Sequence, residues 1–338
     1  MSRYRKREEK KQLYKKLGIV AAVLAAGIAA VAGVLGFADN RLLQQETKKA
    51  ESEEITYQGR TYLPKGNLET YLFAGIDATG MVKERDPQNP GQCDVLILLV
   101  RDRSTDTCQI LSIDRNTMTD VRFYDDEQGE DQGTAEVQIS LAHSMGADQA
   151  SAEGCAENTV EAVSTLLGGI TIDGYAMVNM SAIQTVNDMV GGVTVSIEDD
   201  FTGVDDTLKK GETITLNGEQ AEHFIRGRMY MKDDATNQKR MNRQQQYEEG
   251  FKAAFTQKCA EDNTFPLDLY HGMEPYMTTT ISAKKFSRLA LLMIDEKEES
   301  TVQIEGTYGF DEEHWQTFTP DPDSLQSCIL QMFYEERS

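Results

Sequence analysis

The longest apolar run in the chain, LGIVAAVLAAGIAAVAGVLGFA, covers residues 17–38 and contains no charged side chain. At a rise of 1.5 Å per residue, a helix of this length spans roughly 33 Å, enough to cross the hydrocarbon core of a bilayer. We therefore predict one transmembrane helix over 17–38. A cleaved signal peptide is the alternative interpretation, with Gly36 and Ala38 as small residues before the cut, but the apolar region of such peptides is typically only about 7 to 15 residues long.

Several later segments have the composition and spacing of strands. The run TYLFAGID, residues 70–77, is typical of a buried strand that delivers Asp77 at its carboxyl end. The apolar runs at 93–102 and 107–115 are separated by a short polar turn and predict a hairpin. The segment VTVSI at 193–197 predicts a further strand.

Helical spacing alternates with these strands. Segments 153–167 and 181–190 predict helices, and each is followed by two glycines that close it. Residues 216–229 predict a helix with Asn217 as its N-cap, and residues 236–258 predict a longer one that is rich in good helix formers. Alternation of strands and helices without a long structureless gap is typical of an α/β domain.

These patterns divide the chain into four parts. Residues 1–16 form a basic tail, 17–38 the transmembrane helix and 39–67 a polar stalk, and we predict one α/β domain over 68–338. Such a length is sufficient for a sizeable core. No internal repeat or low-complexity tract is present in the sequence.

Charge is distributed unevenly along the chain. The formal net charge is -22, but residues 1–16 hold eight basic side chains against Glu8 and Glu9, which leaves 26 basic and 54 acidic residues, or -28, for the rest. Basic residues next to a span stay in the cytoplasm, so we expect the domain to lie outside the cell as the ectodomain of a single-pass membrane protein. The acidic charge argues against nucleic acid as a partner.

Several common chemistries lack their sequence signatures. The chain has no Gly-x-Ser-x-Gly elbow, P-loop, dinucleotide-binding glycine motif or His-Glu-x-x-His, so serine hydrolases, nucleotide kinases, dehydrogenases and zincins are unlikely classes. Its four histidines are isolated and indicate no zinc site. Its five cysteines are an odd number, and in a domain with a large core we expect them to be mostly small buried apolar residues.

A basic cluster stands out against this acidic background. Six basic residues within 18 positions face only Asp233 and Asp234, a local charge of +4: Arg226, Arg228, Lys232, Lys239, Arg240 and Arg243. On the predicted helix Arg240, Arg243 and Gln244 share one face, and guanidinium groups bind phosphate with paired hydrogen bonds. The cluster therefore indicates a phosphate-binding face. The same spacing also fits a solvated face whose arginines pair with carboxylates of the domain.

Asp77 and Asp94 form a second constellation, because each lies beside an apolar strand. Two carboxylates near a phosphate site suggest Mg²⁺, which proteins commonly hold by one or two carboxylates together with substrate phosphates. Aspartates at strand edges are also ordinary turn residues, so both interpretations stay open at this point.

The ordered motifs of the domain resemble the LytR-CpsA-Psr family. They are GID, CDVLILL, LSIDRNT, ISLAHSMG, a helix ending in LLG, DGYAMVNM, NDMVGGVTV, LNGEQAEHFIRGR and KRMNRQQ, from Leu68 to Lys258. Two later segments, TTTISAKKFSRLALLM and PDPDSLQSCILQMFY, resemble the carboxyl-terminal portion of the family. A short basic tail and one membrane span are also usual in that family.

The resemblance implies an α/β/α sandwich with a central mixed sheet. It also implies a Mg²⁺-dependent phosphotransferase that moves a glycopolymer, such as teichoic acid or capsular polysaccharide, from a polyprenyl-pyrophosphate carrier onto peptidoglycan. Asp77 and Asp94 match the metal-proximal aspartates of the family, and either of them is a candidate base. The predicted pyrophosphate contacts are Arg115, Arg226, Arg228, Arg240 and Gln244, with Arg243 as a neighbour; Arg115 is also a predicted catalytic residue.

Some positions depart from the family pattern. Gln92 replaces an arginine, for which Arg85 is a possible substitute, Asp114 replaces a proline before Arg115, and Asn237 replaces an acid. These changes leave ligand binding expected and bear on rate and acceptor choice. Two alternative functions therefore stay open: a pyrophosphatase that releases the polymer to water, and a non-catalytic module that binds lipid-linked glycan or regulates wall assembly.

Overall fold

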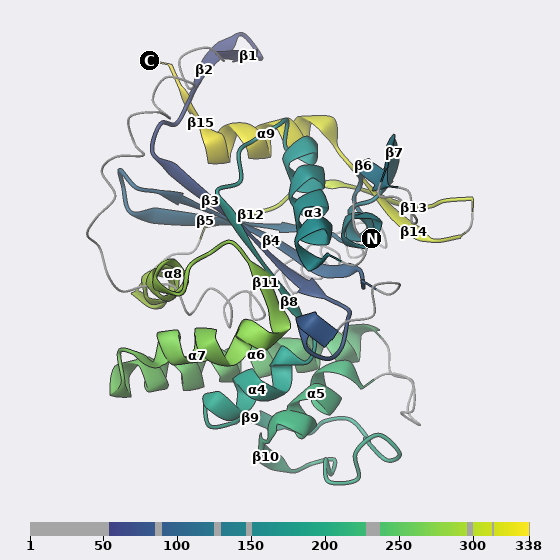
Figure 1. Cartoon of the computed structure of the whole chain (residues 1–338), viewed down its shortest axis with the longest axis vertical. Coiled ribbons are helices and arrows are strands. Elements are labelled where there is room, and N and C mark those ends of the chain that lie inside the picture. Colours follow the sequence, from purple (N-terminus) through teal and green to yellow (C-terminus); the bar gives the residue numbers. More distant parts are fainter. Residues whose placement is uncertain are drawn as a thin grey trace, which may run out of the picture. The chain divides into compact units, whose positions relative to one another are not determined.

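The computed structural model describes residues 54–84, 90–124, 130–146, 151–227, 237–295, 300–312 and 314–337 (Figure 1). The predicted basic tail at 1–16 and membrane span at 17–38 lie outside these ranges. Among the residues described, no helix combines the length and the apolarity needed to cross a bilayer. The transmembrane helix therefore stays a prediction.

The described residues form two compact units. The helical unit comprises Ala74–Asp86 and Ala176–Asp295, and the strand-rich unit comprises Pro87–Tyr175, Glu296–Ser338 and the described part of Leu35–Phe73. The largest sheet has the strand order β11-β8-β3-β4-β5-β12 and contains both parallel and antiparallel pairs. This confirms the prediction of an α/β fold with a central mixed sheet; its three-layer form stays a prediction.

The strand-rich unit is built around an apolar hairpin. Strands β4 (Cys93–Asp102) and β5 (Thr107–Ile113) pair antiparallel, as predicted, and β12 (Ser300–Val302) adds a parallel neighbour to β5. The side chains of Leu96, Leu98 and Leu111 on these strands are fully buried. The preceding strand β3 (Leu68–Ile76) ends immediately before Asp77.

A second group of elements packs beside that hairpin in the strand-rich unit. Helix α3 contacts β6 and the 3-10 helix η2. Gly168 and Gly169 follow this helix with φ of 78° and 85°, a conformation that favours glycine and ends the helix as predicted. Two hairpins complete the group. The bounds are α3 (Ala152–Leu166), η2 (Ile139–Met145), β6 (Met118–Tyr124), β7 (Asp131–Gln138), β13 (Gly306–Phe310) and β14 (Gln316–Pro320).

A small sheet joins the two ends of the described chain. Strands β1 (Ile55–Tyr57) and β2 (Arg60–Pro64) form a hairpin, and β15 (Tyr334–Glu336), which follows α9 (Pro322–Phe333), pairs with β2. We predicted residues 39–67 as a stalk, yet its last part belongs to the folded strand-rich unit. The pairing of β2 with β15 had no local sequence signal, because β15 lies near the opposite end of the chain.

The helical unit holds most of the helices. Strand β11 pairs antiparallel with β8, and β9 pairs with β10. Helices α4, α5, α6, α7 and α8 pack in a series of contacts along the chain (Figure 1). The bounds are η1 (Val82–Glu84), β8 (Gly174–Asn179), α4 (Ala182–Met189), β9 (Val193–Ser196), β10 (Thr213–Leu216), α5 (Gly218–Arg226), α6 (Asn237–Glu261), α7 (Phe265–Met273), η3 (Glu274–Tyr276), β11 (Met277–Thr279) and α8 (Ala283–Asp295).

Helix α6 supplies the core of the helical unit through residues spaced by four. Tyr247, Phe251 and Phe255 are buried on one face, and successive ring centroids lie 6.2 Å apart. Arg243, four residues before Tyr247, continues this buried face and is only 5% exposed. Its position in the core bears directly on its predicted role.

Helix α5 begins as predicted and ends earlier than predicted. The Asn217 side chain accepts a hydrogen bond from the Gln220 N–H at 2.9 Å, and Gln220 Oε1 accepts one from the Asn217 N–H at 3.1 Å, which forms a capping box. We predicted the helix to continue to Met229, but it ends at Arg226. The Phe224 carbonyl, which a longer helix would pair internally, instead accepts a hydrogen bond from Arg243 Nε at 2.8 Å.

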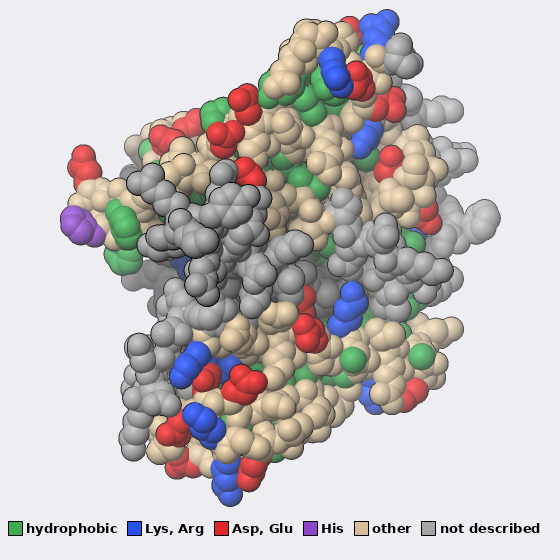
Figure 2. Space-filling model, turned by 180° about the vertical axis from the view of Figure 1, so that it is seen from behind, with side chains coloured by type: hydrophobic (Ala, Val, Ile, Leu, Met, Phe, Trp, Pro, Cys, Tyr) green, Lys and Arg blue, Asp and Glu red, His purple; other side chains and the backbone are tan. Residues whose placement is uncertain are grey.

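Charged side chains of both signs share the surface. On the face in Figure 2, acidic and basic side chains lie interspersed among other side chains and backbone. All five cysteines are buried, as expected. Burial raises the pKa of Cys259 and of Cys328 to about 12.

Candidate functional site

In the helical unit, Asp77 meets Arg226. Asp77 follows the buried strand β3, and its side chain is 54% exposed. Arg226 lies in the last turn of α5, with Nη2 3.7 Å from Asp77 Oδ1 and Nη1 2.6 Å from Glu222 Oε1. Glu222 also accepts a hydrogen bond from Gln184 at 2.7 Å. The guanidinium is therefore held at its back by Glu222 and faces the carboxylate of Asp77 at ion-pair distance.

The loop after Asp77 is fixed by hydrogen bonds. Gly80 has a φ of 82°; its N–H donates to Ser181 Oγ at 2.9 Å, and its carbonyl accepts from Asn179 Nδ2 at 2.5 Å. The Ala78 carbonyl accepts from the Met180 N–H at 3.1 Å. These bonds tie the chain after β3 to the start of α4 and so restrict the position of Asp77.

In the strand-rich unit, Asp94 meets Arg115. The β4–β5 register pairs Leu96 with Ile113, which places Asp94 and Arg115 two residues further along and opposite each other. Arg115 Nη1 donates to Asp94 Oδ1, and Nη2 donates to Gln92 Oε1 at 2.7 Å. The Asp94 side chain is 29% exposed and that of Arg115 is 38% exposed, so a ligand can reach both.

Asp114 holds the turn that carries Arg115. Its Oδ1 accepts hydrogen bonds from the Asn116 N–H at 2.8 Å and from Asn116 Nδ2 at 3.0 Å, and its Oδ2 accepts one from the Tyr308 hydroxyl. Burial raises the pKa of the Asp114 carboxyl, while the bonds from Asn116 lower it. Sequence reasoning noted Asp114 only as a departure from the family pattern; the structure makes it an anchor of the Arg115 turn.

Arg243 has its guanidinium occupied by protein partners. It donates to Asp199, to the Phe224 carbonyl and to the Gly227 carbonyl, and it lies 5.4 Å from the Phe201 ring centroid. These contacts connect α6 to the end of α5, where Arg226 lies. We predicted Arg243 as a neighbour of the pyrophosphate contacts, and its side chain is directed into the core.

A family model described as the LytR_cpsA_psr family matches residues 37–328. This stretch covers most of the chain and includes all eight predicted site residues. The chain belongs to the LytR_cpsA_psr family. The resemblance on which the site residues were predicted is therefore confirmed.

Relatives of the LytR_cpsA_psr chain carry transferase names. It is 31% identical over 179 residues to the polyisoprenyl-teichoic acid–peptidoglycan teichoic acid transferase TagU of Bacillus licheniformis, covering 53% of this chain and 49% of TagU. It is 32% identical over 164 residues to TagV of Bacillus subtilis, a transferase of the same description, covering 46% of this chain and 36% of TagV. The chain thus spans about half the length of the TagU it matches, and less of TagV.

Solved structures support the fold. The crystal structure of B. subtilis TagV has a TM-score of 0.56 at 22% identity and covers 79% of this chain and 96% of that one. Protein gbs0355 from Streptococcus agalactiae has a TM-score of 0.57 at 19% identity and covers 79% of this chain and 86% of that one. At these identities the similarity establishes the architecture of this LytR_cpsA_psr chain and nothing further about its chemistry.

The predicted site residues of this LytR_cpsA_psr chain divide into three groups: two ion pairs, residues outside the described ranges, and residues on α6. Asp77 is brought to Arg226, and Asp94 to Arg115, each pair within its own unit. Arg228 and Arg85 lie outside the described residues; Arg240 lies on α6, where only its backbone is described, and Gln244 is half-buried on the same helix. Within the described ranges, no group of three or more His, Cys, Asp or Glu side chains is arranged to hold a metal.

Glu222, Gln184 and Tyr308 were missed as site residues. Glu222 lies four residues before Arg226, and this i,i+4 spacing is the sequence signal that could have identified the ion pair. Tyr308 had no local signal, because its partner Asp114 lies 194 residues earlier.

Proposed function

We propose that this protein is a membrane-anchored phosphotransferase that moves a glycopolymer from a polyprenyl-pyrophosphate carrier onto peptidoglycan. The observation that carries the proposal is the family match over residues 37–328, which contains every predicted site residue. The transferase names of TagU and TagV support the reaction class. The predicted span at 17–38 supports the anchor, since it would keep the domain at the surface where a polyprenyl lipid resides.

In the proposed reaction a hydroxyl group of the acceptor glycan attacks the phosphorus that bears the glycopolymer. An oxygen–phosphorus bond forms to the acceptor, the bridging bond of the pyrophosphate breaks, and polyprenyl phosphate leaves. Negative charge develops on the phosphoryl and leaving oxygens, and Arg226 and Arg115 are the candidates to stabilise it. The hydroxyl proton passes to a carboxylate, for which Asp77 and Asp94 are the candidates.

We propose Mg²⁺ as the cofactor, and the family resemblance implies Asp77 and Asp94 as its protein ligands. Both carboxylates are hard oxygen donors and both are partly exposed, at 54% and 29%, so a hydrated cation can reach each of them. When bound, the ion would neutralise phosphate charge.

The test uses the full-length protein in detergent with a lipid-linked glycopolymer and peptidoglycan. Arg226→Ala and Asp94→Ala should each lower transfer by about 100- to 1000-fold, the usual cost of one charge-stabilising group, with unchanged thermal melting. Arg337→Ala is the matched control, because Arg337 is exposed and pairs with Glu54. Transfer should also cease on chelation of divalent ions and return with Mg²⁺.

Full transfer by both site variants would contradict the proposal. Phosphate release in the absence of peptidoglycan would favour a pyrophosphatase instead. Tight lipid-glycan binding without turnover under any acceptor would favour a binding module.

A further inference from the structure

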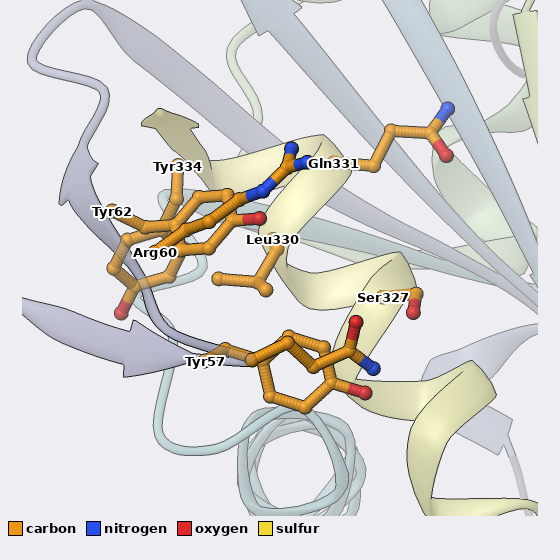
Figure 3. Close-up of a pocket in the computed structure, with 8 residues that line it drawn as sticks. Tyr57, Arg60, Tyr62, Ser327, Leu330, Gln331 and Tyr334 are labelled. Carbon is orange, nitrogen blue, oxygen red and sulfur yellow. The ribbon is translucent and has the colours of Figure 1, made fainter. Parts of the chain in front are cut away.

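A pocket of about 540 Å³ lies in the strand-rich unit and is lined by none of the predicted site residues. It is an open pocket bordered by the β1–β2 hairpin, helix α9 and strand β15 (Figure 3). We propose that it binds a pyranose ring of a glycan chain. This inference rests on the proposed function, because that function brings a glycan chain to the protein.

The pattern of the small sheet explains why three tyrosine side chains line this pocket. Tyr57 pairs with Arg60 across the hairpin, and Tyr62 lies two residues after Arg60, so all three point from the same face of the sheet. Glu336 of β15 pairs with Tyr62, and Tyr334, two residues earlier, joins that face. The face is thus formed by residues from both ends of the described chain.

Helix α9 supplies the opposite wall. Ser327, Leu330 and Gln331 line the pocket at the i, i+3, i+4 spacing of one helix face. Figure 3 shows the Tyr57 ring on one side of Leu330. The rings of Tyr62 and Tyr334 lie together on the other side.

Hydrogen bonds hold this pocket in shape. The Tyr57 hydroxyl donates to Asp323 Oδ1 at 3.0 Å, which ties β1 to the first turn of α9 and raises the pKa of that hydroxyl. Lys65 Nζ donates to the Gln331 carbonyl at 2.8 Å, which ties the end of β2 to the last turn. The hairpin turn has φ of 49° at Gln58 and 78° at Gly59, values typical of a tight two-residue loop. The walls are therefore preformed.

The chemistry of the lining matches a pyranose. Such a ring has apolar C–H faces, which stack on aromatic rings, and hydroxyl groups around its edge, which pair with amides, guanidinium and hydroxyl groups. The pocket offers tyrosine faces and Leu330 for the first, and Gln58, Ser327 and Gln331 for the second. Its volume lies within the range of about 300 to 1,000 Å³ that is usual for small-ligand sites.

Other ligand classes fit less well. A phosphate would require an available cation, but Arg60 lies 3.0 Å from Glu336 Oε2, and the neighbouring Glu335 is exposed. A lipid tail would require an apolar lining, whereas most of these side chains end in polar groups. A neutral sugar ring meets neither difficulty.

The test measures binding of fluorescent glycans to the full-length protein in detergent by anisotropy. One probe is a peptide-free peptidoglycan strand of alternating N-acetylglucosamine and N-acetylmuramic acid, and the other is a glucosylated poly(glycerol phosphate). The Tyr62→Leu/Tyr334→Leu double variant and the milder Gln331→Ala should weaken at least one probe, the double variant by about tenfold, or about 1.4 kcal/mol. Tyr276→Leu, at a half-buried tyrosine outside the pocket, is the matched control and should bind as the wild type does.

The two probes distinguish the acceptor strand from the donor polymer as the source of the sugar, and pocket-dependent binding of either supports the proposal. Equal binding of both probes by the wild type, the double variant and Gln331→Ala overturns it, as does binding of neither by the wild type. Arg226→Ala keeps the pocket intact and should retain glycan binding while it loses transfer. The pocket and the transferase can therefore fail separately.

Discussion

At the residue scale, Arg243 forms a buried ion pair in the helical unit. Its side chain and that of Asp199 are 5% and 7% exposed, so their charges have little access to water. A buried ion pair adds modest stability as a pair, but removal of one partner leaves the other charge poorly solvated. The two backbone carbonyls that Arg243 also holds connect α6 to the end of α5.

We predict that Arg243→Met lowers the free energy of unfolding by about 3 kcal/mol, at the lower end for a buried pair because Lys239 Nζ also lies 3.7 Å from Asp199. Urea denaturation monitored by circular dichroism measures the change. Arg337→Met, which breaks the exposed pair with Glu54, is the control and should cost less than about 1 kcal/mol. Equal losses in the two variants would show that Arg243 is not a core contact.

The burial of Arg243 could be predicted in part from the sequence. It lies four residues before Tyr247, which is followed at the same spacing by Phe251 and Phe255, so a helical projection places it on the apolar face. The basic cluster drew attention to the charge instead. Asp199, its partner, could not be identified because it lies 44 residues earlier in an acidic loop with several equivalent carboxylates.

At the element scale, the β4–β5 hairpin brings Asp94 to Arg115. Both strands were predicted from their apolar runs. The short turn between them fixes the antiparallel register, and that register places these two residues opposite each other. The contact between Asp94 and Arg115 could therefore be predicted from the sequence. Contacts that join distant elements were not: the pairing of β15 with β2 and the hydrogen bond from Tyr308 to Asp114 depend on how the chain returns on itself.

Helix α5 offers a test at this scale, because its capping box sets where the helix that carries Arg226 begins. Asn217→Ala removes the acceptor for the Gln220 N–H and should destabilise the protein by about 1 kcal/mol. Asn217→Asp keeps an acceptor at the helix amino terminus and should restore most of the loss. Thermal denaturation measures both; equal destabilisation by the two variants would exclude capping as the cause.

At the scale of the whole molecule, the two compact units share strands β3 and β8, since the division between them falls within each strand. A strand that contributes to two cores cannot be lost from one of them alone. We therefore expect the units to unfold together, although each has its own buried residues.

The buried thiols test this expectation, because Cys259 lies in the helical unit and Cys328 in the strand-rich unit. Burial raises the pKa of each to about 12, so at pH 8 the thiolate fraction is about 10⁻⁴ and alkylation of the native protein should be slow. Because folding raises both thiol pKa values from 9.0 to about 12, the unfolded state loses these protons at lower pH than the folded state does. The free energy of unfolding should therefore fall as pH rises from about 9 to about 12.

Pulse alkylation with iodoacetamide across a guanidinium series, followed by peptide mass spectrometry, should find that the two thiols become reactive at the same denaturant concentration. Exposure of one thiol well before the other would indicate that the units unfold independently.

The three-stranded sheet has a practical consequence for protein engineering. The Arg337 guanidinium lies 2.6 Å from the carboxylate of Glu54, and the Arg337 N–H donates to the Thr61 carbonyl, so the first and last described residues are neighbours. A brief linker between these positions, with the chain opened at another surface loop, would yield a circular permutant. Such a rearranged protein would dispense with residues 1–53 while keeping β1, β2 and β15 joined.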